Sequence, residues 1–452
     1  MTAPAIDSLA VLPGWLADAA DPDLVAAAVG RHLPEVAGAG GEVLDCKVER
    51  LRLKTDGWAA RYRLTVDDGA GPRTLRLAGM LRPPGSGGNV PELGLELHPE
   101  PGDPGLPELP ALTDPELVRP YLEGLLRAGS PRLAGLTLTG CRPEVLRYKA
   151  GNRCTIRYPL EHGPGGDGQD WPGVVVAKTY AKDSGEGTWR GMRALWASGL
   201  SSGDPVALAE PLAYDPERRV LVQGLVPGDR TLKQLARSAL ADGTPAALET
   251  LAATLDRTAA GLAAMHRAPV TEGGPVGWAE ELGKLRGALP GLALAGPDVA
   301  EAASALVEAV ARAAEATPPD PQGPAHRAFR PAQVLLSGDR IGFIDFDGFC
   351  RAEPAMDVGV FRAALLNIGM YTPLGEGGIS GRLGQVGALG HRFLEAYGAL
   401  ASVSPGRVAV WQGLELVTYV LNGWIKVQPS RLANLLVALE GTSSLTSPAA
   451  GR

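Results

Sequence analysis

The segment from His326 to Asp347 constrains the fold more than any other part of this 452-residue sequence. It begins as His326-Arg327-Ala328-Phe329-Arg330-Pro331-Ala332-Gln333 and continues into the apolar runs 334–336 and 341–344. Asp345 and Asp347 follow the second run. Because residues i and i+2 of a strand point to the same side, we expect both carboxylates to share one face. Two carboxylates so close repel each other unless a cation compensates, which predicts a divalent-cation site. The alternative is a surface pair that caps a turn at Gly348.

Strand-like patterns precede helical ones along the chain. Residues 42–80 and 136–180 alternate between apolar and polar side chains, whereas the chain from Thr231 onward is mostly helical in pattern. The strongest amphipathic pattern covers 246–266. Further helices are expected at 297–315, 380–400, 406–424 and 429–440. Strands first and helices later indicate an α+β protein.

Shorter elements are expected between these regions. Two short helices are predicted within 12–36, and the Pro- and Gly-rich segment 82–110 predicts an irregular connector. Asp114 is a good N-cap for a helix over 115–127. A second helix is expected near 184–198, after a Gly-rich loop at 163–168.

Composition argues against several classes of partner. The formal net charge of −7 argues against general affinity for nucleic acid or anionic membranes. No apolar run approaches the ~18 residues that span a bilayer, and the first residues do not resemble a signal peptide. The four cysteines have neither CxxC nor metal-ligand spacing. We therefore expect a reduced cytoplasmic protein that binds neither nucleic acid nor membrane.

The motifs around His326 resemble those of the aminoglycoside phosphotransferase and choline kinase superfamily, which has a protein-kinase-like fold. In that class, the loop H-x-D-x-x-x-x-N precedes a second acidic motif. The loop Asp accepts the proton of the substrate hydroxyl, and the Asn and the later Asp hold magnesium. Here Ala328 stands at the base position and Gln333 at the Asn position. Asp345 matches the metal-binding Asp, and Asp357 matches an Asp that braces the loop.

The resemblance covers roughly residues 140–365 and implies a bilobal fold. The small β-rich lobe would be 131–222 and the helical large lobe 223–440. An N-terminal α/β accessory region would occupy 1–130, and a flexible tail 441–452. ATP and Mg²⁺ are the implied cofactors.

A lysine ends the apolar segment Val174-Val175-Val176-Ala177-Lys178. A strand buried on both faces rarely keeps a lysine without an anionic partner, whereas an exposed lysine at a strand end is the plain alternative. The resemblance implies that Lys178 contacts nucleotide phosphates. Its helix partner would be Glu186, with Asp183 as a weaker candidate.

Two other segments correspond to nucleotide-binding parts of the family. Residues 147–158 take the place of the phosphate-covering loop and contain Gly151, although a hairpin turn explains them equally well. Residues 220–228 resemble the strand that leads to the hinge. There, backbone groups near Gln223 to Leu225 would bind the adenine edge, and an ordinary strand and turn is the alternative.

Other residues of the loop have implied but less specific roles. His326 would orient the loop, or be a packed histidine without chemistry. Arg330 would contact a phosphate or an acidic substrate, or pair with neighbouring carboxylates. Asp347 would be a second metal ligand, or partly replace the missing base.

The sequence also contains an internal similarity between two Arg-rich segments. Residues 46–54 align with 141–149, residues 61–64 with 157–160, and residues 77–80 with 176–179. This alignment sets Gly79 against Lys178. Coincidence between two amphipathic hairpins and duplication of one hairpin explain the similarity equally well.

Two functions follow from the resemblance. The first is an ATP-dependent phosphotransferase that acts on a hydroxyl of a small molecule or peptide. Its catalysis would be weakened, because a general base typically contributes ~10²–10⁴-fold. The second is a pseudokinase that binds nucleotide and regulates or scaffolds a partner enzyme, for example in a bacterial natural-product or modified-peptide pathway.

Overall fold

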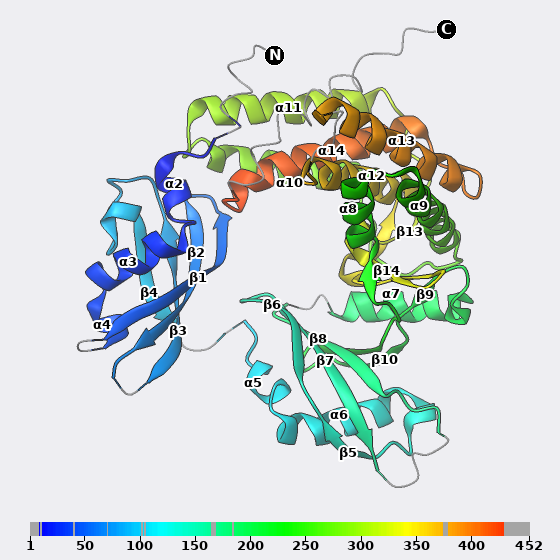
Figure 1. The fold of residues 1–452 in the computed structure, drawn as a ribbon, viewed down its shortest axis with the longest axis horizontal. Helices are drawn as coiled ribbons and strands as arrows, with labels where there is room; N and C mark the ends of the chain where they lie inside the picture. The colour runs from blue at the N-terminus through cyan, green and yellow to red at the C-terminus, as the bar shows by residue number, and fades with distance from the viewer. Residues whose placement is uncertain are drawn as a thin grey trace. The chain divides into compact units, whose positions relative to one another are not determined.

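The computed structural model describes residues 9, 11–38, 41–69, 71–100, 103, 105–163, 169–182, 185–373 and 378–428. The chain forms two compact units (Figure 1). Unit 1 combines Met1–Pro104, Trp278–Thr317 and Gly413–Arg452, and unit 2 combines Gly105–Gly277 and Pro318–Gln412. Asp183, most of the Gly-rich loop at 163–168, the helix expected at 429–440 and the tail at 441–452 lie outside the described residues.

Unit 1 is built on a four-stranded antiparallel sheet in the order β1-β2-β3-β4. Its elements are α2 (Gly14–Asp18), α3 (Pro22–His32), α4 (Pro34–Ala37), β1 (Glu42–Leu53), β2 (Trp58–Asp67), β3 (Pro72–Leu81), β4 (Leu95–Glu100), α10 (Trp278–Leu292) and α11 (Pro297–Glu315). Strand β2 alternates strictly, with Trp58, Tyr62 and Leu64 buried on one face. The Tyr62 hydroxyl donates to the carbonyl of Ala19, 2.8 Å away, which ties the N-terminal helices to the sheet.

Strand β4 lies in the segment that we expected to be an irregular connector. The side chain of Asn89 accepts from the backbone N–H of Leu97 at 2.8 Å and donates to the Leu97 carbonyl at 2.6 Å. This pair of bonds fixes the preceding loop beside the strand. Leu95 and Leu97 of β4 do alternate with polar residues, but the surrounding Pro and Gly residues hid this short pattern.

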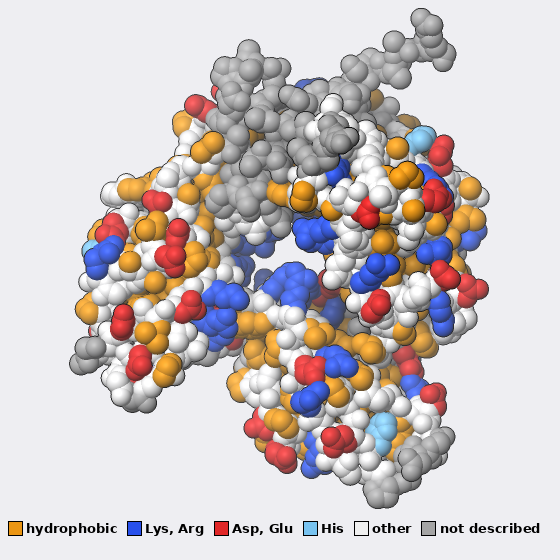
Figure 2. Space-filling model, in the orientation of Figure 1, with side chains coloured by type: hydrophobic (Ala, Val, Ile, Leu, Met, Phe, Trp, Pro, Cys, Tyr) orange, Lys and Arg blue, Asp and Glu red, His pale blue; other side chains and the backbone are white. Residues whose placement is uncertain are grey.

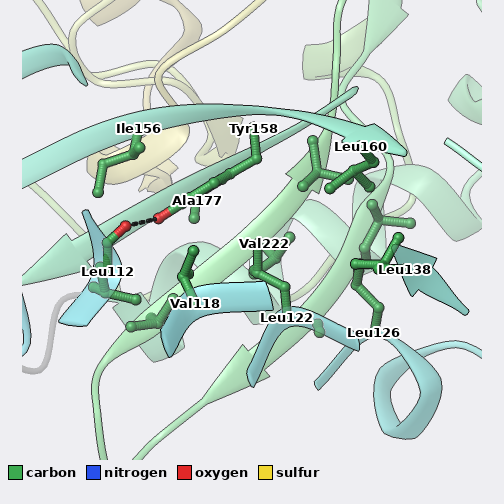
Figure 3. Close-up of a cluster of buried hydrophobic side chains, with 14 of the residues drawn as sticks. Leu112, Val118, Leu122, Leu126, Leu138, Ile156, Tyr158, Leu160, Ala177 and Val222 are labelled. Atoms are coloured by element: carbon green, nitrogen blue, oxygen red, sulfur yellow. Dashed lines mark hydrogen bonds between the residues drawn. The ribbon is translucent and has the colours of Figure 1, made fainter. Parts of the chain in front are cut away.

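The small sheet of unit 2 has the order β10-β11-β8-β7-β5, and β6 also pairs with β7. Its strands are β5 (Leu138–Cys141), β6 (Glu144–Lys149), β7 (Arg153–His162), β8 (Val174–Tyr180), β10 (Pro211–Asp215) and β11 (Val220–Gly224). Helix α6 (Pro115–Gly129) begins at Asp114, as predicted, because that side chain accepts from Glu116 N and Leu117 N. Leu122 of α6 and Ile156 of β7 share one core, in which the Tyr158 hydroxyl donates to the Leu112 carbonyl at 2.7 Å (Figure 3).

The rest of unit 2 is mainly helical. Its helices are α5 (Leu109–Leu112), α7 (Gly185–Ala197), α8 (Leu232–Asp242), α9 (Pro245–His266), α12 (Pro354–Met370) and α13 (Gly378–Gly398), and α14 (Pro405–Ile425) begins in it. Short strands lie among them: β9 (Ala207–Leu208), β12 (Arg230–Thr231), β13 (Gly323–Ala325), β14 (Val334–Ser337), β15 (Arg340–Phe343) and β16 (Cys350–Ala352). A β-rich part followed by a helical part is the kinase-like α+β order, so the predicted fold class is confirmed. None of the described helices is long and apolar enough to cross a membrane.

The compact units divide the chain differently from the expected domains. Helix α6, expected in the accessory region 1–130, packs in the core of unit 2 with Val222 of β11. Helices α10 and α11, expected in the large lobe, belong to unit 1. There α10 packs on β1 so closely that a Cβ on Gly291 would lie 3.0 Å from the Leu53 side chain. Periodicity shows that a helix has a buried face, but it does not identify the surface that covers it.

The two sheets share a strand order. Strands β1, β2, β3 and β4 are antiparallel neighbours in unit 1, as β6, β7, β8 and β11 are in unit 2. A Cβ built on Gly79 would lie 1.7 Å from the backbone oxygen of Glu96, so no side chain fits at the position that aligns with Lys178. The shared order is what duplication of one hairpin predicts.

Candidate nucleotide and metal site

Lys178 lies near the end of β8, between β7 and β11 in the small sheet of unit 2. Its side chain is buried, and its ammonium donates to Asp345 Oδ1 at 3.0 Å and to Asp347 Oδ1 at 2.7 Å. Burial lowers the pKa of Lys178, while the Asp345 carboxylate opposes this shift. The lysine is therefore the buried cation with anionic partners that the strand pattern required.

The two carboxylates meet at Lys178, but not as alternate residues of a strand. Strand β15 ends at Phe343, Asp345 has a left-handed φ of 71°, and a 3-10 turn follows over Phe346–Gly348. The alternation of side chains along a strand therefore does not explain how the two carboxylates come together, because the left-handed residue turns the chain. The turn brings Asp345 and Asp347 to one cation by another route.

Arg153 is a second cation at the same carboxylates. Its Nη1 lies 3.3 Å from Asp345 Oδ1, its Nη2 lies 3.4 Å from Asp345 Oδ2, and it also contacts Asp347. The Tyr180 hydroxyl donates to Asp347 Oδ1 at 3.0 Å. Burial favours the neutral form of Asp345, but Lys178 and Arg153 outweigh it and hold the pKa of this carboxyl well below its usual range. Two cations thus balance two anions.

Hydrogen bonds to Asp357 and to the Ile344 carbonyl fix the start of the loop at His326. The backbone N–H of His326 donates to Asp357 Oδ2 at 2.6 Å, and its ring Nε2 donates to the Ile344 carbonyl at 3.0 Å. Asp357 also accepts from His266 Nε2 at 3.1 Å, and His266 Nδ1 lies 2.8 Å from the Tyr397 hydroxyl. The structure therefore shows the brace expected of Asp357. The sequence offered no signal for His266 or Tyr397 beyond a polar residue on a helix.

His326 is fully buried, which suits an orienting role rather than contact with substrate. Its ring packs against Phe329 and Phe346. Ala328, two residues later, is partly exposed and brings no proton acceptor to the base position.

Gln333 lies across a hairpin from the carboxylates, because its carbonyl accepts from Ile344 N at 3.0 Å. Its side-chain Oε1 is buried and has no hydrogen-bond partner. Among the described residues, no three His, Cys, Asp or Glu side chains gather as a metal site. A buried, unpartnered amide oxygen on the residue that pairs with Ile344, the neighbour of Asp345, nevertheless fits Mg²⁺, which prefers a few oxygen ligands and retains water. Asp345, Asp347 and Gln333 are the residues that would hold it.

Basic side chains surround this ion-pair cluster. Lys149, which faces Arg153 across the β6–β7 hairpin, has a pKa lowered to about 8 by burial and by the neighbouring cations Arg153, Arg147 and Arg330. Figure 2 shows Lys and Arg side chains gathered over β6. The site therefore has a positive surround that suits a polyphosphate. We did not predict Arg153 or Lys149 as site residues, although both lie in the segment proposed to cover phosphates.

The remaining predicted residues are Glu186, Gly151, Gln223, Leu225 and Arg330. Glu186 of α7 pairs with Arg190 and makes no contact with Lys178. Gly151, with φ 60°, lies in a hairpin turn in which Asn152 N donates to the Lys149 carbonyl. Gln223 is buried at the end of β11, whereas Leu225 just after it is exposed. Arg330 lies close enough to Lys149 to lower its pKa.

The order of the elements and the residues of the site resemble those of kinase-like phosphotransferases. The model of the phosphotransferase enzyme family, APH, matches residues 189–415, just over half of the chain, so this chain belongs to that family. No curated protein sequence matches the chain.

Solved structures of low sequence identity are similar to the chain. A choline/ethanolamine kinase family protein from Mesorhizobium loti is 15% identical, with 73% of this chain and 95% of that chain covered and a TM-score of 0.44. A glucosamine kinase in complex with glucosamine, ADP and inorganic phosphate is 19% identical, with 95% and 99% covered and a TM-score of 0.45. The choline kinase LicA from Streptococcus pneumoniae is 14% identical, with 72% and 99% covered and a TM-score of 0.44.

Proposed function

We propose that this chain binds Mg²⁺ and ATP at the cluster of Lys178, Arg153, Asp345 and Asp347, and slowly transfers a phosphoryl group to a hydroxyl of a small molecule or peptide. The observation that carries the proposal is the position of the Lys178 ammonium, 3.0 Å from Asp345 and 2.7 Å from Asp347. A buried lysine beside two carboxylates brings together the two kinds of group that phosphoryl-transfer sites use, a cation for phosphate and carboxylates for a metal.

Each side chain has a distinct part in this proposal. Lys178 and Arg153 exchange their carboxylate partners for phosphate oxygens and neutralise the charge that develops during transfer. Asp357 and His326 hold the loop so that the acceptor is positioned. Bound Mg²⁺ would supply charge neutralisation at the phosphates. Ala328 cannot accept the hydroxyl proton, which passes to water, and the reaction is slow for this reason.

Thermal unfolding with and without Mg²⁺ and ATP tests the nucleotide site. A ligand that binds only the folded chain stabilises it by about 2.7 kcal/mol at a hundredfold excess over Kd. We expect such a shift for the unmodified chain, and we expect it to disappear in Lys178→Ala and Asp345→Ala. Glu186→Ala is the matched control, because Glu186 pairs with Arg190 outside the cluster. An unchanged melting temperature at millimolar nucleotide would refute nucleotide binding.

A pseudokinase is the second candidate, and Ala328 is the observation that favours it. In this case the chain binds nucleotide through the same cluster and regulates or scaffolds a partner protein without turnover. A Mg²⁺·ATP shift without ADP production over hours would select this function over slow phosphotransfer.

Nucleotide affinity is also expected to fall as the pH rises from 7 to 9. The pKa of Lys149 is lowered to about 8, so its charge is present below that pH and is lost above it. Although Lys149 is desolvated enough to lower its pKa, much of its side chain remains accessible to solvent, which screens its charge. We therefore expect the loss of this charge to weaken binding by up to about fivefold. Isothermal titration at both pH values measures the change. Lys149→Arg keeps its charge and should remove this part of the pH dependence, and an equal fall in that variant would contradict the assignment.

A further inference from the structure

The N-terminal sheet of unit 1 has a basic face that the nucleotide site does not use. Along β2, Tyr62 and Leu64 point into the core, whereas Arg61 and Arg63 point to the opposite face. Register places Arg50 of β1 opposite Arg61, and Lys47 opposite Arg63. Arg52 lies two residues beyond Arg50 and opposite Ala59. Figure 2 shows Lys and Arg side chains gathered over this sheet.

Only part of this positive charge is balanced. Glu49 lies 3.2 Å from Arg76 and 3.7 Å from Arg63, and Glu100 lies 2.6 Å from Arg61. Among the described residues, neither Arg50 nor Arg52 has a carboxylate within ion-pair distance.

Arg50 lies in an unfavourable place for an unpaired cation. It is partly buried, and this burial together with the like charges of Arg52 and Arg61 lowers its pKa. Like charges directly opposite on paired strands destabilise a sheet. Nη1 of Arg61 is also buried and has no hydrogen-bond acceptor. A bound anion would relieve the repulsion between these cations.

The residues paired with two of these arginines are small. Ala59 lies opposite Arg52, and Ala78 of β3 lies opposite Arg61, so a small residue pairs with each of these two arginines. Guanidinium groups bind tetrahedral oxyanions with paired N–H donors, and several together suit a dianion. We infer that Arg50, Arg52 and Arg61 form a second anion site, which binds a phosphoryl group of a small molecule.

The sheet of unit 2 offers an independent parallel. In the internal alignment Arg52 corresponds to Arg147, whose charge acts on the buried Lys178 of the candidate nucleotide site. The aligned position in unit 2 therefore lies within electrostatic range of Lys178. The proposed site lies wholly within unit 1 and does not depend on the proposed function of unit 2.

Isothermal titration of the full chain with inorganic pyrophosphate, without Mg²⁺, tests the inference. We expect saturable binding that weakens at least tenfold in Arg50→Gln and Arg52→Gln and persists in Lys178→Ala. Arg73→Gln is the matched control, because Arg73 lies on the same sheet but pairs with Asp68 at 3.2 Å. Unchanged affinity in Arg50→Gln, or binding that disappears in Lys178→Ala alone, overturns the site.

Melting temperature without anion separates a binding role from a structural one. Arg50→Gln removes like-charge repulsion, so it should leave the melting temperature unchanged or raise it, and abolish the rise caused by pyrophosphate. A lower melting temperature in the absence of anion would show that Arg50 is structural and would overturn the proposal. Titration with AMP and with glycerol phosphate then shows whether the phosphoryl group belongs to a nucleotide or to another phosphate ester.

Discussion

Replacing Ala328 with Asp is expected to raise the rate of ATP turnover by about 10²–10⁴-fold. The loop already has the other parts of its geometry, because Asp357 fixes the His326 backbone at 2.6 Å and the Lys178 cluster is assembled. What Ala328 lacks is an atom that accepts the proton of the acceptor hydroxyl. ADP production, measured with water and with a panel of amino-sugar, amino-alcohol and peptide hydroxyl acceptors, gives the rate.

Ala328→Asn is the control for this experiment, since it restores size and polarity without a basic carboxylate. It should remain slow. Ala328→Asp combined with Asp345→Ala should also remain slow, because the added base has no positioned phosphate to act with. If Ala328→Asp binds Mg²⁺ and ATP but turns over no faster than the unmodified chain, the slow-enzyme proposal fails and the pseudokinase function stands.

The second large effect is expected from Arg407→Leu, which should lower the free energy of unfolding by about 3–5 kcal/mol. Arg407 and Glu353 are both buried, and Nε and Nη2 of Arg407 lie 2.7 and 2.6 Å from the two oxygens of Glu353. Glu353 also accepts from Asp320 N at 3.1 Å. Removing the arginine leaves a carboxylate buried without its counter-charge.

Denaturant unfolding of Arg407→Leu, Glu353→Leu and the double variant measures the coupling. Because a buried pair replaced by two apolar side chains is often close to neutral, the double variant should recover most of the lost stability. Glu353 directly precedes α12, the helix that carries Asp357, so Arg407→Leu should also weaken nucleotide binding. A loss below about 1 kcal/mol in Arg407→Leu would show that the pair behaves like a solvent-exposed one.

Short-range spacing made much of the site predictable. His326, Asp345 and Asp357 lie in one ordered stretch, and Lys178 ends an apolar strand, so each can be recognised in sequence. Arg153 cannot be recognised in this way. It is one of many arginines in strand-like segments, and only the pairing of β7 with β6 and β8 brings it to the carboxylates.

For the fold, too, features set by neighbouring residues could be predicted from the sequence, whereas features set by long-range packing could not. The capping carboxylate of Asp114 acts over three residues, and the helix begins where the sequence predicted. The assignment of α6 to unit 2, and of α10 and α11 to unit 1, depends on which apolar faces meet after long separations in the chain. The left-handed turn at Asp345 was hidden for a different reason. Aspartate adopts a positive φ more often than most residues, but this conformation is still uncommon for any residue other than glycine.

The close contact at Gly79 restricts which substitutions the N-terminal sheet can accept during evolution. A single codon change cannot place a lysine there, because any Cβ would collide with the backbone of Glu96 and β4 would first have to move. If the two sheets descend from one ancestor, the loss of a nucleotide lysine in this copy is now difficult to reverse. Selection on this sheet would then act on its arginines, because a lysine that binds nucleotide could not easily reappear at position 79.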